Sequence, residues 1–206
     1  MTDYTDDIHN ERRALRSDLL DALNTEDYPS RDSKARGARA LEIALEEWSQ
    51  NIVEPKGRVK KHRILDYINE GLKWARYGKS YQNRKFAWCG AFMAFCWRDM
   101  LSEKVRYYDC ASTYRLQEWA KGTSRVISSL KDAQAGDIIV VGKGKAWGDH
   151  ITLFERVDEG GYWSVEGNAW GEVPEGGKRK EGVIRRWRAE SEIHAIYRPI
   201  EADYAG

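Results

Sequence analysis

The order of hydrophobic and polar positions divides the chain into a helical first part and a strand-rich second part. In the first part, apolar residues recur at steps of three and four, as they do on helices that bury one face. The pattern predicts helices over residues 5–24, 34–52 and 62–76. Pro55 and Gly57 are expected to end the second of these helices, because both residues disfavour helix continuation.

After Gly136 the spacing changes to that of strands. "GDIIVVG" is a continuous apolar run, typical of a buried strand. "HITLFERV" and "GYWSVEGN" follow as two more strands, and "DEGG" between them predicts a hairpin turn. "GVIRRWR" and "IHAIYRP" complete the set. Helices followed by a small, mainly antiparallel sheet predict an α+β fold.

One main domain is expected, because 206 residues suit a single domain of ordinary size. The polar loop "NTEDYPSRDS" sets its boundary: residues 1–36 form an N-terminal helical extension and residues 37–206 form the domain. The first residues lack the basic and then apolar pattern of a secretion signal. No run of about 18 apolar residues is present, so no membrane-spanning helix is expected.

The charge balance excludes a strong electrostatic preference for one kind of partner. Lys and Arg number 34 and Asp and Glu number 33, so we expect binding to neither nucleic acid nor membrane. We also expect a monomer. The basic cluster "KRKEGVIRRWR" (178–188) is expected to be a solvated strand edge, or else a contact for an anionic polymer. Three cysteines without a CxxC motif, and four histidines that lie far apart, disfavour disulfides and structural zinc.

The most apolar stretch, "FAWCGAFMAFCWRDM", places Cys89 at the start of a helix that should be buried. A helix N-terminus lowers the pKa of a thiol, and its free N–H groups can hold an oxyanion. Cys89 is therefore a candidate nucleophile, with an inert core thiol as the alternative. Cys96, in the middle of the same helix, is expected to be core, and Cys110 is expected to be structural.

His150 opens a predicted strand beside the polar loop "GKGKAWGD" and is the candidate base. Glu166 and Asn168 lie two positions apart in "SVEGNAWG", so both should point to one face of the next strand. The predicted hairpin brings this strand to His150. Either side chain could then accept a hydrogen bond from the imidazole, although each could also be an ordinary hairpin residue.

In this order the motifs resemble those of the CHAP family, papain-like cysteine amidohydrolases and peptidases that are related to NlpC-type enzymes and cut amide bonds in peptidoglycan. The pieces are "WCGAFMAFCW", "AGDIIVV", "GDHITLFERV" and "YWSVEGNAWG", with the lead-in "ALEIALEEWSQNIVEP", over residues 38–170. The resemblance implies a papain-like fold, Cys89 as nucleophile, His150 as base, and Glu166 and Asn168 as the polar groups behind it. It also implies a thioester intermediate and no cofactor.

The chain departs from the family pattern at two points. Asp149 precedes the histidine, where such enzymes more often have Gly or Ser. No Asp-x-Asp loop of the kind that binds calcium in some members precedes Cys89, so no metal is expected.

Further residues near the motifs could contact the substrate. Gln82, upstream of the cysteine, could join an oxyanion hole, or it could be a loop glutamine. Trp88, Trp147 and Trp170 flank the proposed site and could line a substrate groove, with core packing as the rival interpretation.

The protein is therefore expected to be a peptidoglycan amidase or endopeptidase, for example a phage endolysin. Without a signal peptide, such an enzyme needs a holin, a secretion machine or a phage particle to reach the cell wall. Two alternatives stay open. The same Cys–His pair could act on protein amides as a deamidase or transglutaminase-like effector, or the chain could be a non-catalytic phage structural or binding module.

Overall fold

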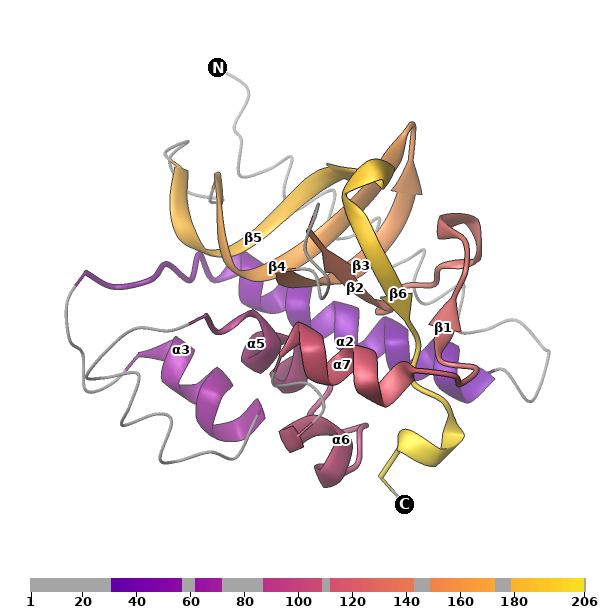
Figure 1. Ribbon diagram of the computed structural model, residues 1–206. Coiled ribbons are helices and arrows are strands. Elements are labelled where there is room, and N and C mark those ends of the chain that lie inside the picture. Colours follow the sequence, from indigo (N-terminus) through magenta and orange to yellow (C-terminus); the bar gives the residue numbers. More distant parts are fainter. Residues whose placement is uncertain are drawn as a thin grey trace.

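The computed structural model describes residues 31–56, 62–71, 87–108, 112–142, 149–172 and 179–205. These residues form an α+β fold, in which the helices lie on one side of a twisted antiparallel sheet (Figure 1). The sheet has six strands in the order β1-β6-β2-β3-β4-β5. The predicted α+β class is confirmed at this level.

The helices are α2 (Arg31–Ser49), α3 (Arg63–Asp66), α5 (Cys89–Cys96), α6 (Glu103–Tyr108) and α7 (Thr113–Ala120). A π-helical turn, η1 (Tyr67–Gly71), directly follows α3. The strands are β1 (Val126–Ile127), β2 (Ile138–Val141), β3 (His150–Asp158), β4 (Gly161–Glu172), β5 (Arg179–Ala189) and β6 (Ile193–Tyr197). Three single-turn 3₁₀ helices complete the set: η3 (Leu130–Asp132), η4 (Glu190–Glu192) and η5 (Glu201–Asp203).

The five predicted strands are confirmed as β2 to β6, because their periodicity is local to each segment. The predicted turn is also present: Asp158 pairs with Gly161, and Gly160 between them has φ of 70°. The two-residue strand β1 and the short helices α6 and α7 were not predicted. They are too short to show a hydrophobic period.

Helix α2 ends at Ser49, earlier than the predicted end at residue 52. Asn51 adopts φ of 56°, which turns the chain out of the helix. The next residue then pairs with the sheet, since the Ile52 carbonyl accepts a hydrogen bond from the Val183 amide at 2.9 Å. Gly182 permits this approach, because a Cβ there would lie 2.2 Å from the Ile52 oxygen. An edge contact with β5 therefore ends the helix.

The start of α2 also differs from prediction. Residues 31–33, expected in a loop, are helical, and the helix crosses the expected domain boundary between residues 36 and 37 without a break. The helix predicted over 62–76 begins at Arg63 and continues as η1 to Gly71; the rest of it lies outside the described residues. The predicted helix over 5–24 lies outside them as well.

The sheet is covered by apolar side chains on both faces around β2. Ile138 and Val140 belong to the main core between sheet and helices. Ile139 and Val141 belong to a second cluster, with Phe154 among its members. Because strand residues alternate between faces, a strand buried on both sides must be apolar throughout. Burial of both faces of β2 therefore explains why its sequence, "IIVV", is apolar without interruption.

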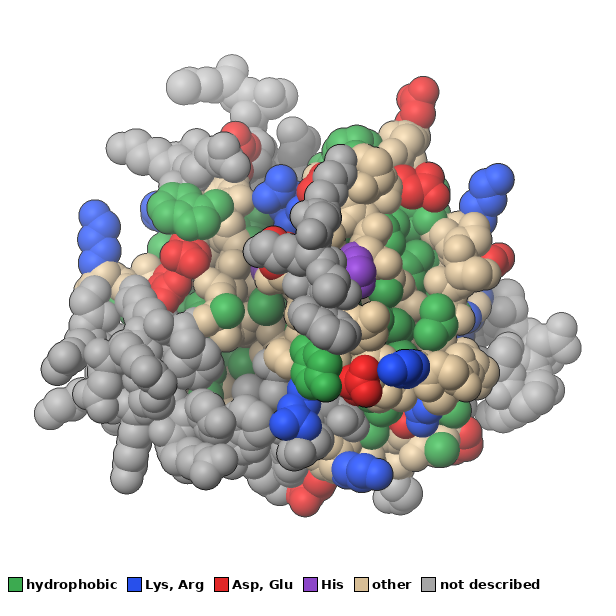
Figure 2. Space-filling model, viewed as in Figure 1, with side chains coloured by type: hydrophobic (Ala, Val, Ile, Leu, Met, Phe, Trp, Pro, Cys, Tyr) green, Lys and Arg blue, Asp and Glu red, His purple; other side chains and the backbone are tan. Residues whose placement is uncertain are grey.

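The surface shows no large region of one charge on the face drawn in Figure 2, where acidic and basic side chains are interspersed. None of the helices in the described ranges is long and apolar enough to cross a membrane.

Candidate active site

The candidate nucleophile Cys89 is the first residue of α5, as predicted. All eight residues of α5 are buried, so the apolar sequence anchors this helix in the core on every side. The first N–H groups of a helix have no partner within it. At this end of α5, the backbone amides of Ile151 and Gly90 are hydrogen-bonded to the Cys89 sulfur. The thiol therefore lies in a setting of converging N–H donors.

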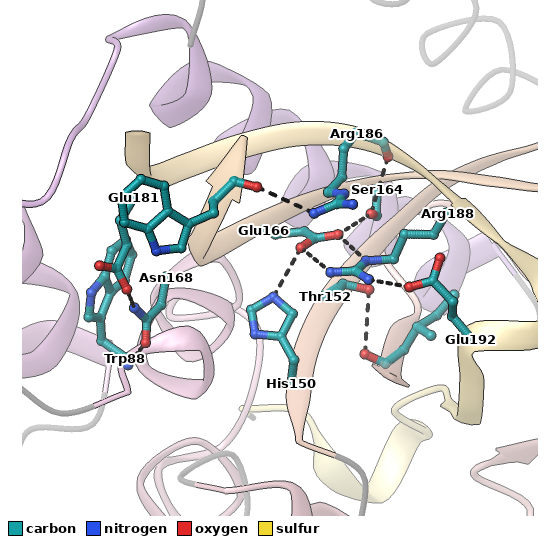
Figure 3. A network of polar contacts seen from close by, with 12 residues as sticks. Trp88, His150, Thr152, Ser164, Glu166, Asn168, Glu181, Arg186, Arg188 and Glu192 are labelled. Atoms are coloured by element: carbon teal, nitrogen blue, oxygen red, sulfur yellow. Dashed lines mark hydrogen bonds and ion pairs between the residues drawn. The ribbon is translucent and has the colours of Figure 1, made fainter. Parts of the chain in front are cut away.

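His150 lies between Cys89 and Glu166. It is the first residue of β3, paired with Val141 of β2, and its side chain is 16% exposed. Its Nε2 lies 3.0 Å from the Glu166 Oε2 (Figure 3). The ring also interacts with the Cys89 thiol, and this contact raises the pKa of His150. The structure thus brings the predicted cysteine, histidine and glutamate together, with the histidine in contact with the other two.

The Glu166 side chain has no exposed surface, and both of its oxygens accept hydrogen bonds from protein donors. Arg188 donates from Nε to Oε1 at 2.5 Å and from Nη2 to Oε2 at 2.8 Å. Ser164 donates to Oε1 at 2.8 Å, from the same strand as Glu166. A buried carboxylate is tolerated only when it is paired and hydrogen-bonded in this way.

The pKa values of Cys89, His150 and Glu166 are all shifted in the direction that favours the charged form of each side chain. Burial alone raises the pKa of the Cys89 thiol, but the hydrogen bond and charge of His150 outweigh it and leave that pKa below its ordinary value. Burial lowers the pKa of His150, but contacts with Cys89 and then Glu166 raise it to about 9. Burial raises the pKa of Glu166, but Arg188 and then His150 bring it down to about 2. The shifts of Cys89 and His150 both act in favour of a thiolate beside an imidazolium.

Cys96 shows what the same helix does to a thiol away from its start. Burial raises the pKa of Cys96 well above the ordinary value, and Glu47 acts in the same direction. The pKa values of two cysteines of one helix are therefore shifted in opposite directions, because Cys89 lies beside His150 and Cys96 does not.

Asn168 contacts a different part of the site from Glu166. Its Oδ1 accepts a hydrogen bond from the Trp88 amide at 2.8 Å, and its Nδ2 donates to Glu181 at 2.7 Å (Figure 3). A β-bulge between Glu166 and Ala169 interrupts the pairing with β5, and Asn168 has φ of 59°. The predicted alternation does not extend across this bulge, which is why the two side chains hold different elements.

Gly167 makes the bulge possible. A Cβ at this position would lie 2.4 Å from the Phe92 Cβ and 2.7 Å from the Trp88 ring, so no larger residue fits against α5. The close approach brings Asn168 to the residue that precedes Cys89.

Replacing Asn168 by glycine is expected to lower the free energy of unfolding by about 1–2 kcal/mol. Glycine adopts positive φ without strain, so the substitution removes only the two hydrogen bonds. The start of α5 should be less firmly held, while the pH profile of Cys89 alkylation should stay unchanged. Urea unfolding and alkylation rates measure these effects. A shifted profile would show that Asn168 acts on the imidazole after all.

The predicted substrate-contacting residues have different positions. Trp88 is 0% exposed and stacks on Tyr67 with ring centroids 5.7 Å apart, so its assignment to substrate binding is corrected to core packing. Trp170, on β4, is 58% exposed and stays available to a ligand. Gln82 and Trp147 lie outside the described residues, as does Cys110.

Sequence reasoning missed the role of Arg188. The basic cluster 178–188 was expected to be solvated, but Arg188 and Arg185 are buried in ion pairs with Glu166 and Glu155. The signal was present in the pairing of strands. From β5, Arg188 reaches Glu166 on the neighbouring strand β4, and Arg185 reaches Glu155 on the next strand, β3.

In the described part of the chain, no group of three or more His, Cys, Asp or Glu side chains is placed to hold a metal ion. Comparison with protein-family models, curated proteins and solved structures finds no match for this chain.

Proposed function

We propose that this protein is a CHAP-like cysteine hydrolase that cuts amide bonds in peptidoglycan. The observation that carries the proposal is the pair of contacts that His150 makes with Cys89 and Glu166, with the thiol at the N-terminus of a buried helix. A nucleophile, a base in contact with it and an acceptor that orients the base are the parts that amide hydrolysis by cysteine requires.

The reaction begins from the thiolate of Cys89 and the imidazolium of His150. The thiolate attacks the amide carbonyl carbon and forms a C–S bond, and the carbonyl electron pair moves to oxygen. Backbone N–H groups at the start of α5 would stabilise this oxyanion, with Gln82 as a further proposed donor. Glu166 stays ionised and compensates the charge of the imidazolium.

Breakdown of the tetrahedral intermediate then uses the proton held by His150. The imidazolium protonates the amine as the C–N bond breaks, which leaves an acyl thioester on Cys89. Neutral His150 next takes a proton from water, and the resulting hydroxide attacks the thioester. The carboxylic acid leaves, the thiolate returns, and no cofactor takes part.

Peptidoglycan as the substrate is supported by the order and spacing of the motifs that resemble the CHAP family. A papain-like arrangement is part of the same proposal: α5, which carries the cysteine, contacts β3 and β4, which carry the histidine and the glutamate. The proposed context is a phage lysin that reaches the cell wall through a holin, a secretion machine or the phage particle. Trp170 is the described aromatic residue proposed to contact the wall polymer.

The test is digestion of purified peptidoglycan by the wild type, Cys89→Ala and the matched control Cys96→Ala. We expect loss of turbidity and release of soluble fragments from the wild type and the control, and none from Cys89→Ala. Mass spectrometry of the fragments identifies the bond. Equal release by Cys89→Ala would contradict the nucleophile. If the wild type hydrolyses protein amides but leaves walls intact, the substrate is wrong and the chemistry stands.

A further inference from the structure

We infer that Arg188 is a positioning residue of the proposed reaction: its two-pronged contact holds Glu166 in the orientation in which the carboxylate supports His150. This inference rests on the proposed function. It concerns a residue that does not touch the nucleophile and that the motif resemblance does not include.

The geometry of the contact is specific to arginine. Nε and Nη2 of Arg188 donate to different oxygens of Glu166, at 2.5 Å and 2.8 Å. The same Oε2 that receives Nη2 also faces His150 Nε2 at 3.0 Å. The rigid guanidinium fork thus fixes the carboxylate plane, whereas a lysine ammonium would supply charge without that plane.

Arg188 is itself held in place from the other side. Its Nη1 donates to Glu192 Oε2 at 2.8 Å, and Glu192 Oε1 accepts a hydrogen bond from the Ala189 amide at 3.2 Å. Glu192 lies in η4, directly after β5. A chain of contacts therefore runs from η4 through Arg188 and Glu166 to His150 (Figure 3).

Polar and charged groups face Glu166 from each neighbouring element. They are His150 from β3, Ser164 and Tyr162 from β4, Arg188 from β5 and, beyond it, Glu192 from η4. Arg188 is the cation in direct contact with the carboxylate whatever the state of His150. Without the fork, the buried carboxylate would bind a proton more readily and support the imidazolium less well. The thiolate fraction of Cys89 would then fall at a given pH.

The chain offers a matched control on the same strand. Arg185 makes an equivalent two-pronged contact with Glu155, through Nε at 2.7 Å and Nη2 at 2.8 Å. Both side chains of that pair are almost fully buried. Arg185 stacks over Trp163, outside the contact chain that leads to His150. Substitution of Arg185 therefore removes a comparable buried ion pair from β5 without changing the contacts between Arg188, Glu166 and His150.

The experiment compares the wild type, Arg188→Lys and Arg185→Lys in the rate of Cys89 alkylation by iodoacetamide as a function of pH, followed by peptide mass spectrometry. For Arg188→Lys we expect the midpoint to move upward by about one unit, which is about tenfold slower alkylation below the midpoint. The midpoint of Arg185→Lys should equal that of the wild type. Wall hydrolysis by Arg188→Lys should fall in the same proportion.

A double substitution keeps the test decisive if Arg188→Lys does not fold. Glu166→Gln/Arg188→Met replaces the charged pair with neutral side chains, which buried sites often tolerate. If Arg188 acts only through Glu166, the midpoint of this variant will lie no higher than that of Glu166→Gln alone, because removing the arginine then causes no further loss.

Three results would overturn the inference: an unchanged midpoint in Arg188→Lys, an equal shift in Arg185→Lys, or a midpoint of the double variant above that of Glu166→Gln. A failure of the proposed function looks different. Were wild-type Cys89 alkylated no faster than Cys96, the nucleophile itself would be wrong, and the role of Arg188 would fall with it. A shifted profile in an enzyme that leaves peptidoglycan intact would support Arg188 and reject only the substrate.

Discussion

Replacing His150 by alanine is expected to lower peptidoglycan hydrolysis by at least about a thousandfold, or about 4 kcal/mol in the activation barrier. His150 is in contact with the thiol and with Glu166, and in the proposed mechanism it performs two steps. It holds the proton that makes Cys89 a thiolate, and it delivers that proton to the leaving amine. Both are lost together, so kcat should fall far more than KM rises.

The same variant should alter the chemistry of the thiol. Burial raises the pKa of Cys89, and the contact with His150 is the main opposing cause. In His150→Ala the midpoint of Cys89 alkylation should therefore move above the ordinary cysteine value. His194→Ala is the matched control, because His194 is exposed on β6. Retention of more than about a tenth of wild-type activity by His150→Ala would reject the assigned base.

Replacing Glu166 by glutamine is expected to lower the free energy of unfolding by about 3–5 kcal/mol at neutral pH. The substitution removes the anion that pairs with Arg188 and leaves that guanidinium in a buried site. Urea unfolding measures the difference. Glu192→Gln is the control, and its effect should be below about 1 kcal/mol because the Glu192 side chain is partly exposed.

The pH dependence of this difference has a definite sign. The folded pKa of Glu166 is about 2, against an ordinary value of 4.5. The stability that comes from its ionisation is therefore fully present above pH 4.5 and is lost as the pH falls through 2. Wild type and Glu166→Gln should converge over that window. A gap that persists at the acid end would show that packing, and not charge, accounts for the loss.

His150 gives the opposite dependence at alkaline pH. Its folded pKa of about 9 exceeds the ordinary 6.5, so its contribution is complete below pH 6.5 and is lost as the pH rises through 9. Glu166→Gln removes one of the two partners that raise this pKa, so the alkaline loss should be smaller in the variant.

Much of the fold could be read from local patterns. Strands β2 to β6 follow short runs whose alternation or continuous apolar character is complete within the segment. The start of α5 at Cys89 follows from the switch between a polar loop and a wholly apolar helix. Pairing across a short hairpin then sufficed to place His150 near the strand of Glu166.

Tertiary contacts overrode local pattern at helix ends and at the bulge. The end of α2 depends on an edge contact between Ile52 and β5, which no local spacing reports. Glu166 and Asn168 could not be separated by sequence alone, because a strand of alternating residues presents both on one face. The bulge, which Gly167 permits by packing closely against Phe92, separates them in the fold.

The sequence by itself predicted the candidate residues: a cysteine that begins a buried helix, a histidine that begins a strand, and a glutamate or asparagine on the adjoining strand. Only the tertiary structure decided that Glu166 faces the histidine, that Asn168 holds the Trp88 amide, and that Arg188 is buried. The physical reason is that a charged side chain is predicted from sequence alone to be exposed to solvent. Its burial becomes favourable only when a carboxylate from another strand meets it in the fold.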